Sequence, residues 1–336
     1  MARITIVSPC YNEEENVEAC YQAVLALFAP DGPLAHHERE HIFSDNASED
    51  ATVEILRRIA STDQSAKVIL NARNFGPFRS NFNALRYATG DAILVFLPVD
   101  LQDPPEMVPE MVRHWENGIE VVAGARVNRE ETWMLRTCRR IFYRIVNMLS
   151  DFEIPENVGE FQLIDRKVWE VVVSHRDQYP YIRGIIASAG FRRLIIPYTW
   201  KARKRGISKN NALRLIDQAM NGIFSFTAAP MRFCSFLGFG VATLALLYAL
   251  FIFLLALVTP QAAPAGTQTI IIALFFFSGV QLMFIGIMGE YITAIHSQVR
   301  RGPMVVERER INFDPPAPPS DAVRKTPDEN DHRGFR

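Results

Sequence analysis

The sequence is poor in cysteine and almost without net charge. Its 336 residues include 4 cysteines, and the formal net charge is −1. No two cysteines have the spacing of a C-x-x-C or zinc-finger motif, which favours free thiols in a reducing compartment over a disulfide framework. A chain without a global basic field is a poor match for nucleic acid, and we expect none as a partner. The N-terminal stretch MARITIVSPCYNEEEN has no long apolar run, so we expect no secretory signal peptide.

Charged residues are missing from two long runs near the C-terminus, Phe233–Val258 and Ile270–Met288. About 20 apolar residues are enough to cross a bilayer, so the runs predict two transmembrane helices at about residues 233–258 and 269–289. The link between them, TPQAAPAGTQT, has no Lys or Arg, whereas basic residues lie before the first run and after the second. The positive-inside rule therefore predicts a multi-pass protein of the cytoplasmic (inner) membrane with both termini in the cytoplasm. Two buried core helices of a soluble protein are the alternative, but tandem uncharged runs are rare in soluble domains.

Residues 1 to about 125 alternate between strand-like and helix-like segments. The strand-like segments are β-rich or fully apolar: RITIVSP, HIFS, AKVILN, DAILVFL and IEVVAGAR. Alternation of this kind predicts a Rossmann-like, doubly wound α/β sheet. Ligands of such sheets bind beyond the carboxyl ends of the strands, where we find four polar residues: Tyr11, Asp45, Asp100 and Arg126. We therefore expect these four side chains to share one site.

The composition divides the chain into five parts. Residues 1–210 form the predicted cytoplasmic α/β domain, and residues 211–230 form an amphipathic helix expected to lie in the membrane interface. The two transmembrane helices fall within residues 231–293. Residues 294–313, which include VRRGPMVVERERIN, form a cytoplasmic segment with a candidate strand. The Pro-rich, charged residues 314–336 form a disordered tail.

Eight short motifs follow one another between about residues 3 and 310: VSPCYNEEENV, FSDNASEDAT, NFGPFRSN, LQDPPE, VVAGAR, GEFQLIDRKV, YIRGII and RKRGISKN. In this order they resemble the family 2 glycosyltransferases, and more narrowly the polyprenyl-phosphate glycosyltransferases of the dolichyl-phosphate mannose synthase type. Two C-terminal spans are the layout of the bactoprenol glucosyltransferases. Each motif alone is weak, since a string such as YNEE occurs by chance, whereas the ordered set with two spans is specific.

The resemblance implies a GT-A catalytic domain that transfers one sugar, with inversion. The implied donor is a UDP- or GDP-sugar, and the implied acceptor is a polyprenyl phosphate at the cytoplasmic face of the lipid bilayer. Pro9, Tyr11 and Glu13 match the nucleoside-binding turn after the first strand, and Asp45 matches the acid that reads the base. Each has an ordinary alternative, since Glu13 also suits a helix start and Asp45 suits a turn. Proteins of this kind can form homo-oligomers, so a second copy is an implied partner.

Asp100 and Gln102 match the family segment that binds metal and diphosphate, which implies Mg²⁺ or Mn²⁺ as cofactor. The family pattern is D-x-D-L-Q-D, and Pro98 replaces its first acid. Mg²⁺ usually takes one or two carboxylates together with phosphates and waters, so Asp100 with a nucleoside diphosphate meets that minimum. The acceptor needs no strong general base either, because a phosphate monoester has a second pKa of about 6. We expect a working site with looser metal binding, in which Asp103 caps the following helix.

Three further positions depart from the family pattern and bear on donor identity and metal dependence. Asn46 replaces an acid, Ala47 replaces a glycine and Glu160 replaces an aspartate. Glu160 has two open interpretations, either as a group that positions the acceptor or sugar, or as a satisfied structural acid.

Cations are expected to stabilise the leaving diphosphate, because Arg and Lys both bind phosphate. The motif match favours Arg126, Arg203 and Lys209, and with Asp100 and Glu160 these make up the predicted catalytic set. Further basic residues line one predicted helix: Arg139, Arg140 and Arg144. For others the positive-inside bias and contacts with anionic lipid are the preferred explanation: Lys204 and Arg214. The histidines of HHEREH are interpreted as solvated loop residues: His36, His37 and His41.

Two other functions stay open at this point. A polysaccharide synthase usually carries a Q-x-x-R-W motif and more spans, neither of which the sequence contains. A membrane-anchored protein that kept the fold and lost the chemistry would explain the four departures. The sequence leaves open the sugar, the base of the nucleotide and the length of the polyprenol.

Overall fold

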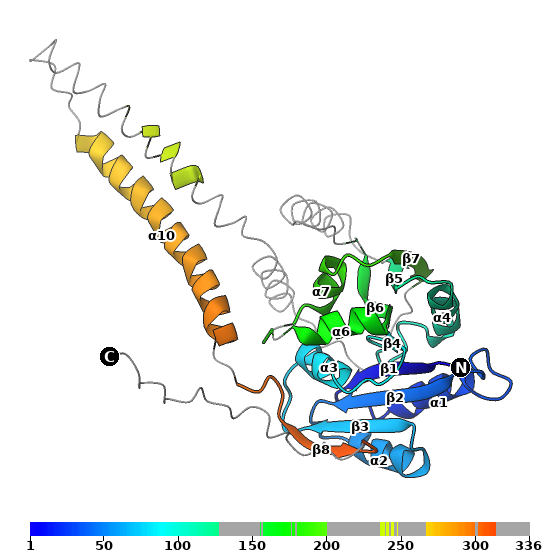
Figure 1. Cartoon of the computed structure of the whole chain (residues 1–336). Coiled ribbons are helices and arrows are strands. Elements are labelled where there is room, and N and C mark those ends of the chain that lie inside the picture. Colours follow the sequence, from blue (N-terminus) through cyan, green and yellow to red (C-terminus); the bar gives the residue numbers. More distant parts are fainter. Residues whose placement is uncertain are drawn as a thin grey trace, which may run out of the picture.

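The computed structural model describes residues 1–127, 155, 157–175, 177–178, 180–199, 236–238, 240–241, 243–244, 247, 267–299 and 302–313. These residues include an α/β domain around one 8-stranded sheet and a long helix that extends away from it (Figure 1). The strand order is β7-β5-β6-β4-β1-β2-β3-β8. The strands are β1 (Arg3–Cys10), β2 (Glu38–Asp45), β3 (Ala66–Asn71), β4 (Ala92–Leu94), β5 (Val121–Val127), β6 (Val158–Asp165), β7 (Arg193–Thr199) and β8 (Glu307–Ile311). The helices are α1 (Val17–Leu27), α2 (Thr52–Thr62), α3 (Pro77–Leu85), η1 (Pro105–Met107), α4 (Val108–Glu116), α6 (Arg166–Ser174), α7 (Ile182–Ser188) and α10 (Thr267–Val299).

The sheet is mixed. β1 pairs in parallel with β2 and β4, and β2 pairs in parallel with β3. β6 is antiparallel to β4 and β5, β7 is parallel to β5, and β8 is antiparallel to β3. The carboxyl ends of β1–β5 and β7 and the amino ends of β6 and β8 therefore lie at one edge, which we call the carboxyl edge. The expected α/β fold of the GT-A kind is confirmed, and its sheet is mixed.

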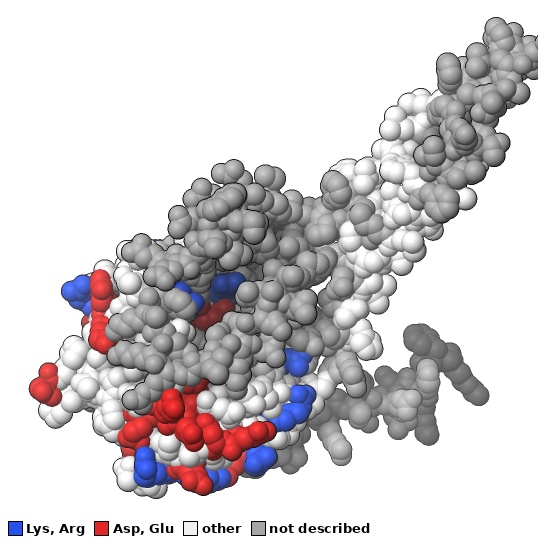
Figure 2. Space-filling view, turned by 180° about the vertical axis from the view of Figure 1, so that it is seen from behind, with Lys and Arg blue, Asp and Glu red and all other residues white. Residues whose placement is uncertain are grey.

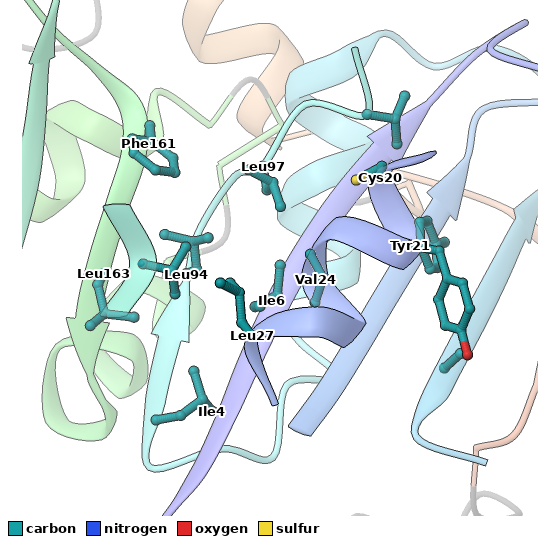
Figure 3. Packing of buried hydrophobic residues seen from close by; sticks show 14 of the residues in the cluster. Ile4, Ile6, Cys20, Tyr21, Val24, Leu27, Leu94, Leu97, Phe161 and Leu163 are labelled. Atoms are coloured by element: carbon teal, nitrogen blue, oxygen red, sulfur yellow. The ribbon is translucent and has the colours of Figure 1, made fainter. Parts of the chain in front are cut away.

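Two buried layers of apolar side chains hold helices against opposite faces of the sheet. Side chains alternate along a strand, so Ile4 and Ile6 of β1 join one layer and Val7 joins the other. Figure 3 shows the first layer, in which Val24 and Leu27 of α1 lie close to these isoleucines. α2 and α4 also join this layer, whereas α3, α6 and α7 join the second. Burying each large aliphatic side chain stabilises the fold by about 1.5–3 kcal/mol, so β1 is held firmly at the centre.

The last strand, β8, returns to the sheet after the long helix α10. It pairs with β3 from Val68–Ile311 to Asn71–Glu307, and so covers a strand that would otherwise form the edge of the sheet. The candidate strand within residues 294–313 is therefore confirmed.

Asn312 anchors the end of β8. Its side-chain amide donates to the carbonyl oxygens of Ala60, Asp63 and Ala66 at 2.7, 3.2 and 2.9 Å. Its backbone is also left-handed, with a φ of 62°, a conformation that Asn tolerates better than most residues. One side chain thus ties the C-terminal strand to the end of α2 and the start of β3.

We predict that Asn312→Ala lowers the free energy of unfolding by about 2 kcal/mol, because part-buried carbonyls lose their donor and the left-handed backbone becomes strained. Glu309→Gln is the matched control, since the pair of Arg57 with Glu309 is exposed and contributes at most about 1 kcal/mol. Melting temperatures of the detergent-solubilised protein would rank the two variants. An equal loss in both would contradict the anchoring role of Asn312.

α10 is the one helix in the described part of the chain that is long and apolar enough to cross a membrane. It has 33 residues, and its segment Phe276–Thr293 has a mean hydropathy of 1.3. It coincides with the second predicted span and continues to Val299 (Figure 1). Most of the first predicted span lies outside the described residues, although Gly238 is close enough to α10 that an added Cβ would lie 3.5 Å from the ring of Phe284. The predicted interfacial helix at 211–230 and the predicted tail at 314–336 also lie outside them.

Candidate functional site

The sheet has a topological switch point at β1. From β1 the chain adds β2 and β3 on one side, and it then crosses to place β4 on the other side. Ligands of open α/β sheets bind in the crevice at such a point, outside the carboxyl ends of the strands. The residues after β4 stay beside β1, since the Leu97 amide donates to the Val7 carbonyl at 2.8 Å. The turns that hold Tyr11 and Asp100 therefore flank the switch point.

Hydrogen bonds join the turn after β1 to the turn after β2. The strands end in register, with Cys10 opposite Asp45, so the two turns start side by side. The Asn12 amide donates to Ser48 Oγ at 2.9 Å, and the Glu13 amide donates to Thr52 Oγ1 at 2.9 Å. The predicted nucleoside-binding residues after β1 are thus held beside Asp45.

Glu13 is also engaged at the start of α1. Its carboxylate accepts from the Asn16 side chain at 2.7 Å, and its carbonyl accepts from the amides of Asn16 and Val17 at 2.9 Å. These contacts support the alternative that Glu13 serves the start of α1. Its role in binding the nucleoside stays a prediction.

Asp45 is buried, with 1% of its surface exposed. Burial raises the pKa of its carboxyl group, and the Ser48 hydrogen bonds act in the opposite direction. The Ser48 amide donates to Oδ2 at 3.0 Å and the Ser48 hydroxyl donates to Oδ1 at 2.5 Å. Asp45 is thus a turn former in this structure, and its carboxylate can bind a base only at lone pairs that Ser48 leaves available.

The backbone of these turns is strained at three non-glycine residues. Asn12, Ala47 and Leu101 have left-handed φ values of 54°, 63° and 56°, one in each turn after β1, β2 and β4. A left-handed residue with a side chain costs about 1–2 kcal/mol, and such residues gather at functional sites. Ala47 stands where the family pattern has glycine, so this backbone explains why glycine suits the position.

Asn46 has a structural reason to be an amide. The Phe75 amide donates to Asn46 Oδ1 and the Gly76 amide donates to Asn74 Oδ1, both at 2.9 Å. These backbone donors identify the oxygen of each side chain, so the Asn46 nitrogen is left to donate to Asn74 Oδ1 at 2.9 Å. A carboxylate cannot donate this bond. Asn46 therefore joins the turns after β2 and β3 through both ends of its side chain.

We predict that Asn46→Asp costs about 1–3 kcal/mol of stability at neutral pH, because the new carboxylate would face the Asn74 oxygen in a buried position. The repulsion raises the pKa of the new acid, so the loss should shrink near pH 4, where the protonated acid can donate. Melting temperatures of wild type and variant at both pH values test this. A loss that does not depend on pH would contradict the assigned donor role.

Asp100 and Gln102 lie in a tight turn that starts at Pro98. The Leu101 amide donates to the Pro98 carbonyl at 3.1 Å, and the Gln102 amide donates to Asp100 Oδ1 at 3.1 Å. The predicted metal ligands are thus close in space. Their donor set of one carboxylate and one amide oxygen suits Mg²⁺ or Mn²⁺ only together with phosphate oxygens and waters.

Asp103 does not cap the following helix, which corrects the prediction. Its carboxylate is fully buried and pairs with Arg126, whose Nη2 donates to Oδ2 at 3.0 Å. The Tyr198 hydroxyl donates to the other oxygen, and Arg126 Nε donates to that hydroxyl at 3.0 Å. Burial by itself lowers the pKa of Arg126. The Asp103 carboxylate has the larger opposite effect, so the pKa is raised overall and the guanidinium stays charged.

Tyr198 was not predicted from the sequence. Gly124 in the motif VVAGAR is the local signal for it, because a Cβ at Gly124 would lie 2.9 Å from the Tyr198 ring.

This cluster gives Arg126 structural contacts that were not expected. Two of its nitrogens donate to Asp103 and to the Tyr198 hydroxyl. Arg126 is at the carboxyl edge as predicted, and its direct role toward a phosphate stays a prediction.

Glu160 lies at the amino end of β6, at the same edge. Arg183 Nε is 4.0 Å from Oε1, and Oε2 is buried without a hydrogen-bond partner among the described residues. Burial raises the pKa of Glu160, and the nearby Arg183 charge only partly offsets it. Unsatisfied buried groups with shifted pKa values are typical of functional sites. Arg183, which YIRGII contributes, is a site neighbour that sequence reasoning did not single out.

We predict that Glu160→Gln stabilises the protein at alkaline pH. A raised pKa means that the folded protein holds the Glu160 proton more tightly than the unfolded chain, so wild-type stability falls as pH rises through the folded pKa. The variant lacks this loss and should match wild type near pH 4.5. Glu309→Gln is the control of opposite sign, because its bonds to Arg57 lower the pKa of Glu309. Parallel pH profiles of melting temperature for the two variants would contradict the prediction.

The surface around the first two turns is acidic. Exposed acids lie near the starts of α1 and α2: Glu14, Glu15, Glu49 and Glu54. Figure 2 shows a dense group of Asp and Glu side chains on the face seen from behind, with Lys and Arg more scattered. An anionic diphosphate at this edge therefore needs a counter-cation. The remaining predicted cations lie outside the described residues: Arg139, Arg140, Arg144, Arg203 and Lys209.

The chain is similar to several known proteins. The family model described as Glycosyl transferase family 2 matches residues 5–172. The chain is 32% identical to the bactoprenol glucosyl transferase of Shigella phage SfII over 314 residues, which covers 93% of this chain and 100% of that protein. It is also 32% identical to an uncharacterized glycosyltransferase of Bacillus subtilis (strain 168), with 92% of this chain and 94% of that protein covered. Among solved structures, a mannosyltransferase of Pyrobaculum calidifontis in complex with GDP-Man and Mn²⁺ has 17% sequence identity and a TM-score of 0.44, with 90% of this chain and 88% of that chain covered.

Proposed function

The chain belongs to glycosyl transferase family 2, and on this premise we propose that it transfers one sugar from a nucleoside-diphosphate sugar to a polyprenyl phosphate, with inversion. That it is a glycosyltransferase follows from the family match and from its relatives. The choice of donor, acceptor and membrane face is our proposal. It rests above all on the convergence of the turns after β1, β2 and β4 at the switch point of the sheet.

The donor is proposed to bind across the β1 end of the carboxyl edge. Pro9, Tyr11 and Glu13 would hold the nucleoside, with Asp45 reading the base. Asp100 and Gln102 would hold Mg²⁺ or Mn²⁺, which when bound neutralises the charge of the diphosphate. The acidic surface supports this need for a cation, because the diphosphate alone would be repelled.

The acceptor is proposed to arrive from the membrane at the same edge. α10 ends at Val299, and β8 begins at Glu307, which pairs with Asn71 at the carboxyl end of β3. The apolar helix therefore joins the sheet at the edge that carries the candidate site. Bactoprenol in the name of the 32% identical phage relative supports a polyprenyl acceptor. The multi-pass arrangement with both termini in the cytoplasm, and any homo-oligomer, belong to this proposal.

The proposed reaction is a single in-line displacement. An oxygen of the lipid phosphate attacks the anomeric carbon as the bond from that carbon to the diphosphate oxygen breaks, so the configuration inverts. The phosphate is already largely ionised at neutral pH, and the enzyme mainly aligns the two substrates. Glu160 would position the acceptor or the sugar, Arg126 would position Asp103 and the turn beside Asp100, and Arg203 and Lys209 would stabilise the phosphates.

We predict that Asp100→Asn lowers sugar transfer at least about 100-fold, because removing one group that stabilises transition-state charge has an effect of this size. The purified protein would receive undecaprenyl phosphate and, one at a time, labelled UDP-glucose, UDP-N-acetylglucosamine, UDP-galactose and GDP-mannose. Each donor would be tested with Mg²⁺, with Mn²⁺ and with chelator. Transfer of label to the organic phase measures the reaction and names the sugar.

Asp31→Asn is the matched control, since it makes the same change of charge on an exposed loop before β2 and should keep full activity. Unchanged turnover in Asp100→Asn would refute the metal assignment. A folded wild-type protein that transfers none of the four sugars would point to another donor or to a protein without activity. Binding of free UDP and GDP would then separate these two outcomes.

A further inference from the structure

Two histidines and a glutamate meet at the opposite edge of the sheet, far in the fold from the candidate site. His36 and His37 lie directly before β2, and Glu116 is the last residue of α4. Nε2 of His37 is 3.2 Å from Glu116 Oε1, and Nε2 of His36 is 3.7 Å from the same oxygen. One ligand atom from each of the three residues lies within 4.8 Å of the others. The loop before β2 and the end of α4 thus present three metal-ligating side chains to one point.

His37 makes this more than a surface cluster. Its side chain is only 3% exposed, so the prediction of a solvated His37 is wrong. Neither ring nitrogen has a partner with good hydrogen-bond geometry within the described part of the chain, although the Ala2 backbone lies near the ring. Burying a ring nitrogen without a hydrogen-bond partner destabilises the folded protein, because the nitrogen gives up its hydrogen bonds to water. A bound ligand would compensate for this loss. The contact with Glu116 is close in distance but does not have the geometry of a hydrogen bond. The ring therefore faces the carboxylate at 3.2 Å without a well-formed hydrogen bond between them.

The position of Glu116 at the end of α4 favours a cation beside its carboxylate. A carboxylate at the C-terminal end of a helix meets the negative end of the helix dipole, which is unfavourable by itself. A bound cation reverses the sign of this interaction. His36 supplies the third ligand from the solvent side, since its side chain is 63% exposed and its ring centroid lies 4.1 Å from that of His37, with the ring planes tilted by 42°.

We propose that His36, His37 and Glu116 bind a zinc-like divalent ion, which fastens the loop before β2 to the end of α4. Two imidazoles and one carboxylate, with a fourth position for water, form a ligand set typical of Zn²⁺. Mg²⁺ is a poor match, because it prefers oxygen ligands. Tetrahedral Zn²⁺ needs its ligand atoms about 3.3 Å apart, so the exposed His36 has to move inward on binding. The site is independent of the proposed catalytic metal in both place and chemistry.

The test uses the full chain in detergent, purified through a tag without histidine and freed of metal with a chelator. Zn²⁺ is then titrated in competition with a chromophoric chelator. We expect one tight Zn²⁺ per chain, and at least a tenfold loss of affinity in both His36→Gln and Glu116→Gln. Zinc at roughly 100 times its dissociation constant should raise the melting temperature of wild type by about 5 °C, and this rise should vanish in both variants. His37 is left intact because its burial makes a folding defect an expected result of substitution.

Two matched variants separate this site from other zinc-binding groups. His114→Gln removes a histidine of α4 outside the cluster and should bind zinc as wild type does. Asp100→Asn should also bind zinc unchanged, because it lies at the carboxyl edge. Equal zinc affinity in wild type, His36→Gln and Glu116→Gln would overturn the proposal, as would loss of the tight site in Asp100→Asn. The outcome does not depend on sugar transfer, so it stands or falls separately from the proposed function.

Discussion

The architecture of the candidate site depends on one buried carboxylate. Asp103 is fully buried, so its charge has to be balanced inside the protein, and Arg126 of β5 does this while the Tyr198 hydroxyl of β7 donates to its second oxygen. Removing Arg126 would leave an uncompensated charge in the interior, and removing Tyr198 would leave a buried carboxylate oxygen without this donor. The pairing therefore fixes the turn that follows β4 against two other strands. Asp100 lies three residues earlier in that turn, so the buried ion pair of Asp103 and Arg126 also restricts the position of Asp100.

The pairing of Arg126 with Asp103 also affects how the charge of a bound diphosphate can be stabilised. A guanidinium that balances Asp103 supplies less net positive charge to a bound diphosphate than an isolated arginine would. The surface beside the switch point is acidic, which increases the need for cations from elsewhere. Divalent metal and the basic residues Arg203 and Lys209 are the further sources of positive charge on which the proposed function draws. The loss of the first acid to Pro98 is consistent with a site whose metal is held mainly by its substrate.

Local patterns predicted much of this molecule, because the signals for β1–β5 and their helices lie within a few neighbouring residues. The carboxyl-edge location of Tyr11, Asp45 and Asp100 followed from those patterns and from the family motifs. The contacts of Asp103 did not, since Tyr198 is 95 positions away and no periodicity links the two. The amide pairing of Asn46 with Asn74, which turns an apparent defect into a structural requirement, was missed for the same reason. Glu160 was found by motif, but its unsatisfied oxygen could be seen only once β6 and α7 were placed together.

Because β8 pairs with β3, which lies far earlier in the sequence, the sheet can be completed only late in synthesis of the chain. β3 leaves the ribosome early, and its outer row of amides and carbonyls has no strand to pair with until residues 307–311 have been made. By then the long apolar helix α10, which precedes β8, has also been translated. An unpaired strand of this kind invites association with other chains and recognition by chaperones. The α/β domain can thus complete its sheet only after α10 has been translated, so that an early strand of the chain depends on a late one for its pairing.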